Sequence, residues 1–251
     1  MINYLTPKMR MYKTAIVYYG KSAIDPNQNI LVGVSGLAGT SVNRKTGVMA
    51  QLTIIPDPEL YNPIEASKIL AVNKSVCGNC QLQYNPITKK KPCYVNLGHE
   101  PMQLYKSYHK GLPTISPEQL NQLLIERDLG IRLGNYGDPA SIPIEIIKTI
   151  TKHNVKYTSY THAWTLPNFN SEHLKYSMLS IDHTNYDQAK KLFPNARSYR
   201  MINNASELQD NEILCPSKQI PGFKWNSITC SQCLLCSGSS KIAKNIAIIG
   251  A

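Results

Sequence analysis

Seven cysteines in two spaced groups constrain this chain more than any other feature. The members are Cys77, Cys80 and Cys93 in the first group and Cys215, Cys230, Cys233 and Cys236 in the second. Intervals of two residues occur in both groups and are typical of cysteines that bind one metal centre. Three thiolates leave a coordination position open, whereas four close the shell. We therefore expect one open and one closed metal site.

Composition favours a folded protein in a reducing compartment. The chain has 251 residues, of which 42% are hydrophobic and 17% charged, so it can bury a core. Residues 1–19 mix Lys8, Arg10 and Lys13 with short apolar stretches, unlike a signal peptide or a membrane span. We expect a cytoplasmic protein with no membrane partner, in which an odd number of cysteines serves metal binding instead of disulfides.

The net charge of +11 indicates a polyanionic partner, either nucleic acid or a nucleotide. Only residues 89–91 form a run of lysines, and the other basic residues are spread along the chain. A basic surface that is simply solvated explains the charge equally well. Charge alone therefore leaves both interpretations open.

Residues 1–75 read as a β-rich N-terminal layer. Three apolar or β-branched runs, at 14–19, 29–34 and 48–55, lie between glycine, asparagine and proline. Residues 43–47 have the composition of a hairpin turn.

Residues 76–205 alternate between helical and strand patterns and form the expected α/β core. Helices are expected at 117–127, with Ser116 as N-cap, and at 143–153 and 185–193; strands are expected at 130–134, 155–159, 176–181 and 196–201. Short strands joined by helices predict a curled, mostly parallel sheet that resembles a partial (β/α) barrel. Residues 206–251 form a cysteine-rich segment that ends with a strand at 245–249.

Ligands of such sheets gather where the strands end. The polar residues at these positions are Asn135, Gly137, Asp138, His162, Asp182, His183, Asn203 and Asn204. The first five are the candidate cofactor-binding residues. Asp138 is also an ordinary turn residue before proline, and either histidine can serve a purely structural role.

The first cysteine group and the following strand resemble the radical S-adenosylmethionine superfamily over residues 77–201. The resemblance consists of a three-cysteine loop whose last cysteine precedes Tyr94, and of the turn at 134–139, where that family has a Gly-Gly-Glu-Pro-like motif. The chain is also similar to phage-encoded iron–sulfur proteins of unassigned activity. It differs from the superfamily in the twelve residues between Cys80 and Cys93 and in having Asp138 in place of glutamate.

The resemblance implies a [4Fe–4S] cluster on Cys77, Cys80 and Cys93, with S-adenosylmethionine on the fourth iron. Its methionine amine would meet the turn of Gly137 and Asp138. It also implies a phage or mobile-element enzyme, and the net charge favours a nucleotide or nucleic acid as the molecule that it modifies.

The second cysteine group offers a complete ligand set. The run from Cys230 to Cys236 resembles a ferredoxin-type motif and favours iron–sulfur, with zinc as the alternative metal. The superfamily often carries an auxiliary four-cysteine cluster at this place.

Two functions without catalysis remain open from the residues. His99 or His109 would complete a Cys3His site in a nucleic-acid-binding protein, with Tyr84, Tyr94 and Tyr105 stacking on bases. The second function without catalysis is that of an electron carrier that uses both clusters. The sequence contains no P-loop, dinucleotide-binding, HExxH or nucleophile-elbow motif.

Overall fold

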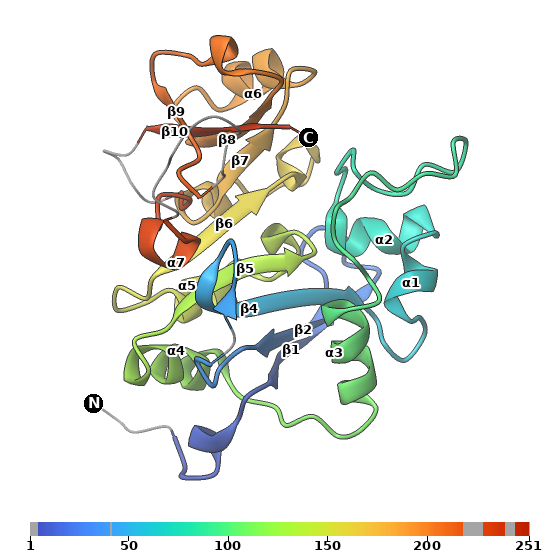
Figure 1. Cartoon of the computed structure of the whole chain (residues 1–251). Helices are drawn as coiled ribbons and strands as arrows, with labels where there is room; N and C mark the ends of the chain where they lie inside the picture. The colour runs from blue at the N-terminus through green and yellow to red at the C-terminus, as the bar shows by residue number, and fades with distance from the viewer. Residues whose placement is uncertain (1–4, 41, 218–227, 239–243, 251) are drawn as a thin grey trace.

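One sheet of ten strands organises the protein (Figure 1). The structure, a computed structural model, describes residues 5–40, 42–217, 228–238 and 244–250. The strand order is β1-β2-β4-β5-β6-β7-β8-β10-β9, with β3 paired to β4. Because β1 and β9 end this row, the sheet is open, as in a partial barrel. The expected α/β architecture with a mostly parallel sheet is confirmed.

The first strands pair antiparallel. They are β1 (Ala15–Lys21), β2 (Asn29–Ser35), β3 (Val42–Asn43) and β4 (Gly47–Pro56). The expected turn at 43–47 joins β3 to β4, since the Asn43 side chain accepts hydrogen bonds from the backbone N–H groups of Lys45 and Thr46. Gly47 then takes a φ of 71°, which favours glycine.

From β4 onwards all neighbouring strands are parallel. They are β5 (Gly130–Tyr136), β6 (Tyr157–Thr161), β7 (Met178–Ile181), β8 (Ser198–Ile202), β9 (Glu212–Leu214) and β10 (Asn245–Ile249). The expected strands at 130–134 and 245–249 are confirmed. The strands expected at 155–159, 176–181 and 196–201 each begin two residues later than expected. Each of the segments 1–75, 76–205 and 206–251 supplies strands to this one sheet.

Seven α-helices are found in the described part of the chain. They are α1 (Pro63–Ala66), α2 (Leu70–Cys77), α3 (Glu100–Tyr108), α4 (Pro117–Glu126), α5 (Ile144–Ile150), α6 (Tyr186–Leu192) and α7 (Cys230–Cys233). Short 3-10 turns lie at Met9–Met11, Pro139–Ser141, Ala163–Thr165, Ser171–Lys175 and Ala205–Glu207. Ser116 caps α4 as expected, in a reciprocal capping box with Gln119. The sequence patterns did not predict α1, α2 or α3.

The two faces of the sheet differ in chemistry, as the strand register shows. Val34 pairs with Leu52 and Leu52 with Leu133, so one face is apolar, and this face packs in the main core with Leu120 of α4 and Ile147 of α5. The opposite face is here called the front face. Its neighbouring residues on adjacent strands are Ser35 and Gln51, Gln51 and Arg132, Arg132 and Thr158, Tyr160 and Met178, Ser180 and Tyr199, and Tyr199 and Ile246. The front face is therefore largely polar in β4 to β6.

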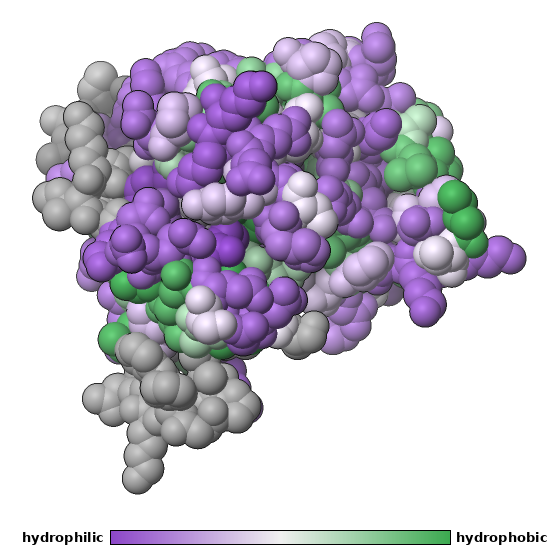
Figure 2. All heavy atoms as spheres, turned by 90° about the horizontal axis from the view of Figure 1, so that it is seen from above, coloured by the Kyte–Doolittle hydropathy of each residue, from purple (hydrophilic) through white to green (hydrophobic). Residues whose placement is uncertain are grey.

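Seen from above, the surface is mostly hydrophilic, with apolar residues at the lower left and a further group at the right edge (Figure 2). This is the side on which α1 and α2 lie in Figure 1. Leu60 and Ile64, before and within α1, and Ile87 of the loop between Cys80 and Cys93 are exposed, Ile87 by 89%. In the described ranges, no helix is long and apolar enough to cross a membrane.

His173 makes the stability of the fold depend on pH. Its Nδ1 atom has no hydrogen-bond partner among the described residues, and burial lowers the pKa of His173 to about 4. The unfolded chain takes up this proton near pH 6.5, so the stabilisation is complete above that pH and is lost as the pH falls towards 4. We expect the loss to reach roughly 3 kcal/mol. Urea unfolding at pH 7 and pH 4.5 should show a smaller difference in the free energy of unfolding for His173→Phe than for the unchanged protein.

Candidate metal centre

The first cysteine sits at the end of a helix that is bonded to the parallel sheet. Cys77 is the last residue of α2, after which Gly78 takes a φ of 55° and turns the chain. The backbone N–H of Asp138 donates to the carbonyl of Val76 at 2.5 Å. This bond holds Cys77 beside the turn that follows β5, at the carboxyl end of the strand.

Cys93 returns to the first two cysteines because the intervening residues form a hairpin. The backbone N–H of Cys93 donates to the carbonyl of Leu82 at 2.9 Å, and that of Asn85 donates to Lys90 at 2.8 Å. Residues 83–92 therefore project from the molecule, and Cys93 lies next to Leu82, two residues after Cys80 (Figure 1). The spacing of twelve residues becomes a compact three-cysteine loop.

A network of hydrogen-bonded polar side chains connects the cysteine loop to β5. The Tyr136 hydroxyl donates to Asn73 Oδ1 at 3.0 Å, and Asn73 Nδ2 donates to Gln83 Oε1 at 2.6 Å. Gln83 Nε2 then donates to the carbonyl groups of Gly78 and Cys80. Since Asn73 and Tyr136 are buried, this network fixes the loop against β5.

Two of the first three thiols, those of Cys77 and Cys80, are desolvated. Burial raises the pKa of Cys77 well above its usual value, and the neighbouring Cys80 and Cys93 raise it further. Burial also raises the pKa of Cys80 to about 12. Binding a metal here replaces the thiol protons with positive charge, which offsets the cost of burying thiolates.

Asp138 holds two strand ends together. Its Oδ1 accepts a hydrogen bond from the N–H of Ala140 at 2.9 Å, and its Oδ2 accepts from His162 at 2.6 Å and Ala163 at 3.1 Å. Burial raises the pKa of the Asp138 carboxyl, against the backbone donors that favour its charged form. Asp138 is 4% exposed. These contacts give it a positioning role between β5 and β6.

The structure brings four of the five expected cofactor-binding residues to the cysteine loop and its adjoining turn. Asp138 and Asp182 both interact electrostatically with Cys80. His162 interacts with these two carboxylates, and burial lowers the pKa of its imidazole. Gly137 lies in the turn itself with a φ of 83°. Asn135 instead donates to Glu100 on the front face at 2.5 Å.

The four C-terminal cysteines come together in a second place. Helix α7 docks on the β3–β4 turn, because the N–H groups of Cys230 and Ser231 donate to the carbonyls of Lys45 and Thr46. Cys215 donates its N–H to Ala247 of β10, and the Cys236 carbonyl accepts from Ser159 of β6. Three separate parts of the sheet, the β3–β4 turn, β10 and β6, thus anchor this segment.

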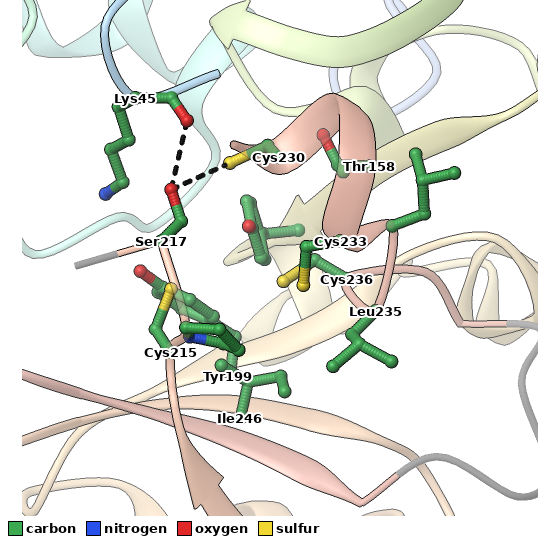
Figure 3. A pocket seen from close by; sticks show the side chains of 13 residues that line it. Lys45, Thr158, Tyr199, Cys215, Ser217, Cys230, Cys233, Leu235, Cys236 and Ile246 are labelled. Carbon is green, nitrogen blue, oxygen red and sulfur yellow. Dashed lines mark hydrogen bonds between the residues drawn. The ribbon is translucent and has the colours of Figure 1, made fainter. Parts of the chain in front are cut away.

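All four of these cysteines line one hollow over the front face (Figure 3). Tyr160 and Tyr199 form its floor, with ring centroids 4.4 Å apart. Burial raises the pKa of Cys236 to about 12 and that of Cys215 above its usual value. Cys230 is the member whose sulfur lies near the Ser217 hydroxyl, at 3.7 Å.

Arg132 connects the two cysteine sites across the front face. Its Nη2 donates to the hydroxyl of Tyr94, the residue after Cys93, at 2.9 Å. Its guanidinium also interacts electrostatically with Tyr160 and Cys230. A cation at this position stabilises negative charge on Cys230 of the second group.

The donor chemistry fits metal at both sites, and the side-chain geometry is not that of a bound metal. Among residues 5–40, 42–217, 228–238 and 244–250, no group of three or more His, Cys, Asp or Glu side chains is arranged so that it could hold a metal ion as it stands. Thiolate sets of three and four suit iron–sulfur clusters or zinc. Metal at either site would require the thiols to turn towards a common centre.

The two candidate histidine ligands lie elsewhere. His109 Nε2 faces the carbonyl of Pro58 at 3.2 Å, and its ring packs edge-on against Tyr105 and Tyr108. His99 is an exposed residue at the start of α3. The residues that interact with the Cys77 thiol are Cys80, Cys93, Tyr136 and Asp138.

Sequence reasoning missed the polar residues that lie between the two sites. Arg132, Tyr160 and Tyr199 line the front face, and Glu100 joins them from α3 through Asn135. The sequence contains one signal for Arg132. It stands between Ile131 and Leu133 in a strand, so the alternation of side chains places it on the face opposite to these two apolar residues.

Comparisons of the chain with protein-family models, with curated proteins and with solved structures found no match.

Proposed function

We propose that this protein binds two iron–sulfur clusters and resembles radical S-adenosylmethionine enzymes in its organisation. Cys77, Cys80 and Cys93 would hold the open cluster, and the four C-terminal cysteines the closed one. The observation that carries the proposal is the hydrogen bond from Cys93 to Leu82, which makes a compact three-cysteine loop at the carboxyl ends of parallel strands. Ligands of parallel sheets bind at these ends.

The open cluster would supply one electron to cleave the sulfonium of S-adenosylmethionine at an iron without a protein ligand. The chain's own residues would position that cofactor. The turn of Gly137 and Asp138 directly adjoins the cysteine loop through the bond from Asp138 to Val76. Asp138 accepts from the backbone N–H of His162, and Asp182 accepts from the backbone N–H of Thr184 beside the same loop.

A nucleotide or nucleic acid is the substrate class that the charge favours. The chain carries a net charge of +11, and Lys89 and Lys90 are exposed on the hairpin between Cys80 and Cys93. Tyr94, exposed by 76%, offers an aromatic surface at the base of the same hairpin. Phosphate groups and bases are recognised by this combination.

The proposal predicts a defined chemical result. Anaerobic reconstitution with iron and sulfide should give about eight irons per chain and broad visible absorbance. Reduction with dithionite in the presence of S-adenosylmethionine should then yield 5′-deoxyadenosine. A colourless protein that retains stoichiometric zinc would refute the cluster assignment, and intact clusters without 5′-deoxyadenosine would refute the catalytic part.

The exposed lysines and Tyr94 also favour a second candidate, a zinc- or cluster-stabilised protein that binds nucleic acid without turnover. In that case both sites would be structural. Binding to RNA or DNA that weakens steeply with salt, together with a lack of 5′-deoxyadenosine, would support this function over the first.

A further inference from the structure

A cavity separate from both cysteine sites lies on the front face beneath α3. Its volume is about 250 Å³, and its walls come from β2, β4 and α3. The helix approaches the sheet closely because β2 has a glycine at the contact. A Cβ atom at Gly33 would lie 2.3 Å from Leu104 Cδ1 of α3.

The cavity is lined mostly by polar side chains. They include Thr14, Ser35, Thr53, Gln103 and Ser107, with one carboxylate, Glu100. The lining residues, all within the described ranges, include no lysine, arginine or histidine. The local charge is therefore opposite in sign to that of the whole protein, which is +11. Arg132 interacts electrostatically with Glu100, but it does not line the cavity, and its guanidinium donates to Asn135 and Tyr94. A phosphate or carboxylate would therefore have no counter-ion among the lining residues.

Glu100 is held in place and retains the capacity to bind a ligand. The Ser35 hydroxyl donates to Oε1, and Asn135 Nδ2 donates to Oε2. Each carboxylate oxygen accepts two hydrogen bonds, so each has room for one more donor. A protonated amine is the donor that a half-buried carboxylate binds most strongly.

Thr53 supplies a second, independent indication of a ligand. It lines the cavity and is 2% exposed, yet its Oγ1 has no hydrogen-bond partner in the described part of the protein. Buried hydroxyl groups without a partner are rare because they lose their hydrogen bonds to water. A hydroxyl or amine in the cavity would provide that missing partner.

We propose that this cavity binds a small molecule that carries a protonated amine together with hydroxyl groups, with the amine on Glu100 and a hydroxyl on Thr53. Phosphorylated forms of the same molecule are excluded. The inference does not depend on metal at either cysteine site, so its outcome is separable from that of the proposed function.

Methyl NMR titrations test the inference at the site itself. The resonances of the Thr53 and Leu104 methyl groups are followed while two matched pairs are added, glucosamine against glucose and serinol against glycerol. We expect at least one amine to cause saturable shifts, with binding roughly tenfold or more tighter than its hydroxyl counterpart. Glucosamine 6-phosphate should bind more weakly than glucosamine.

Two isosteric variants and a control complete the test. Glu100→Gln should weaken amine binding roughly ten- to hundredfold, whereas Glu118→Gln, the same change in the first turn of α4, should not affect it. Thr53→Val should weaken binding and leave the folded protein at least as stable to heat. The inference is wrong if neither amine gives saturable shifts, if amines and polyols bind equally, or if Glu100→Gln has no effect.

Discussion

Replacing Cys93 with serine should remove one cluster and leave the other. We expect the iron content of anaerobically reconstituted protein to fall from about eight to about four per chain, because Cys93 completes the first ligand set. Cys233→Ser should also lose about four irons, from the second set. Iron and sulfide analysis with Mössbauer spectroscopy measures both.

The two variants differ in their effect on chemistry. Only Cys93→Ser should abolish formation of 5′-deoxyadenosine entirely, since the open site adjoins the turn of Gly137 and Asp138. The double variant should contain no cluster. If either single variant loses all of its iron, or none, the cysteines do not form two independent sites.

Glu212→Gln should destabilise the fold by about 3–5 kcal/mol, because it leaves the buried Arg200 without a counter-ion. Arg200 Nε and Nη2 donate to the two carboxylate oxygens of Glu212 at 2.7 and 2.5 Å, and the side chains are 6% and 1% exposed. The pair joins β8 to β9 across β10, where Ala247 is small enough to let it pass. Urea unfolding measures the loss.

An exposed ion pair provides the matched control. Asp128 pairs with Lys156 at 2.9 Å and is 86% exposed, so Asp128→Asn should cost less than about 1 kcal/mol. Replacing Arg200 with methionine and Glu212 with leucine together should recover most of the loss, since no charge then remains buried. A cost below about 1 kcal/mol for Glu212→Gln would contradict the assigned role of the pair.

Local sequence signals predicted those elements whose causes lie within a few residues. Ser116 and Gln119 cap α4, and Asn43 closes the turn between β3 and β4. In each case the side chain lies three residues or fewer from its partner. The second cysteine group was recognisable for the same reason, since Cys230, Cys233 and Cys236 follow one another at short intervals and gather with Cys215 around one hollow.

Pairings between distant residues could not be read from such signals. Cys93 joins Cys77 and Cys80 only because a hairpin forms between them, and the superfamily's own compact spacing gave no indication of it. The helices α2 and α3 were missed since their patterns are short and depend on packing against β4. Asp138 was expected to face a cofactor, and its contacts to His162 and Ala163 appear only when β5 and β6 lie side by side.

The sequence by itself determined the donor atoms, seven thiols in sets of three and four, and the alternation of strands and helices from α4 to β8 that makes a parallel sheet. Only the tertiary structure decided which side chains share a face. Strand register places Arg132 on the front face, where it contacts Tyr94 and interacts with Cys230, and the packing of α3 against Gly33 brings Glu100 and Thr53 to one cavity. The physical reason is that strand register and helix packing depend on contacts summed over many residues that are distant in the sequence. Metal-ligand spacing, in contrast, depends on residues that are close together in the sequence.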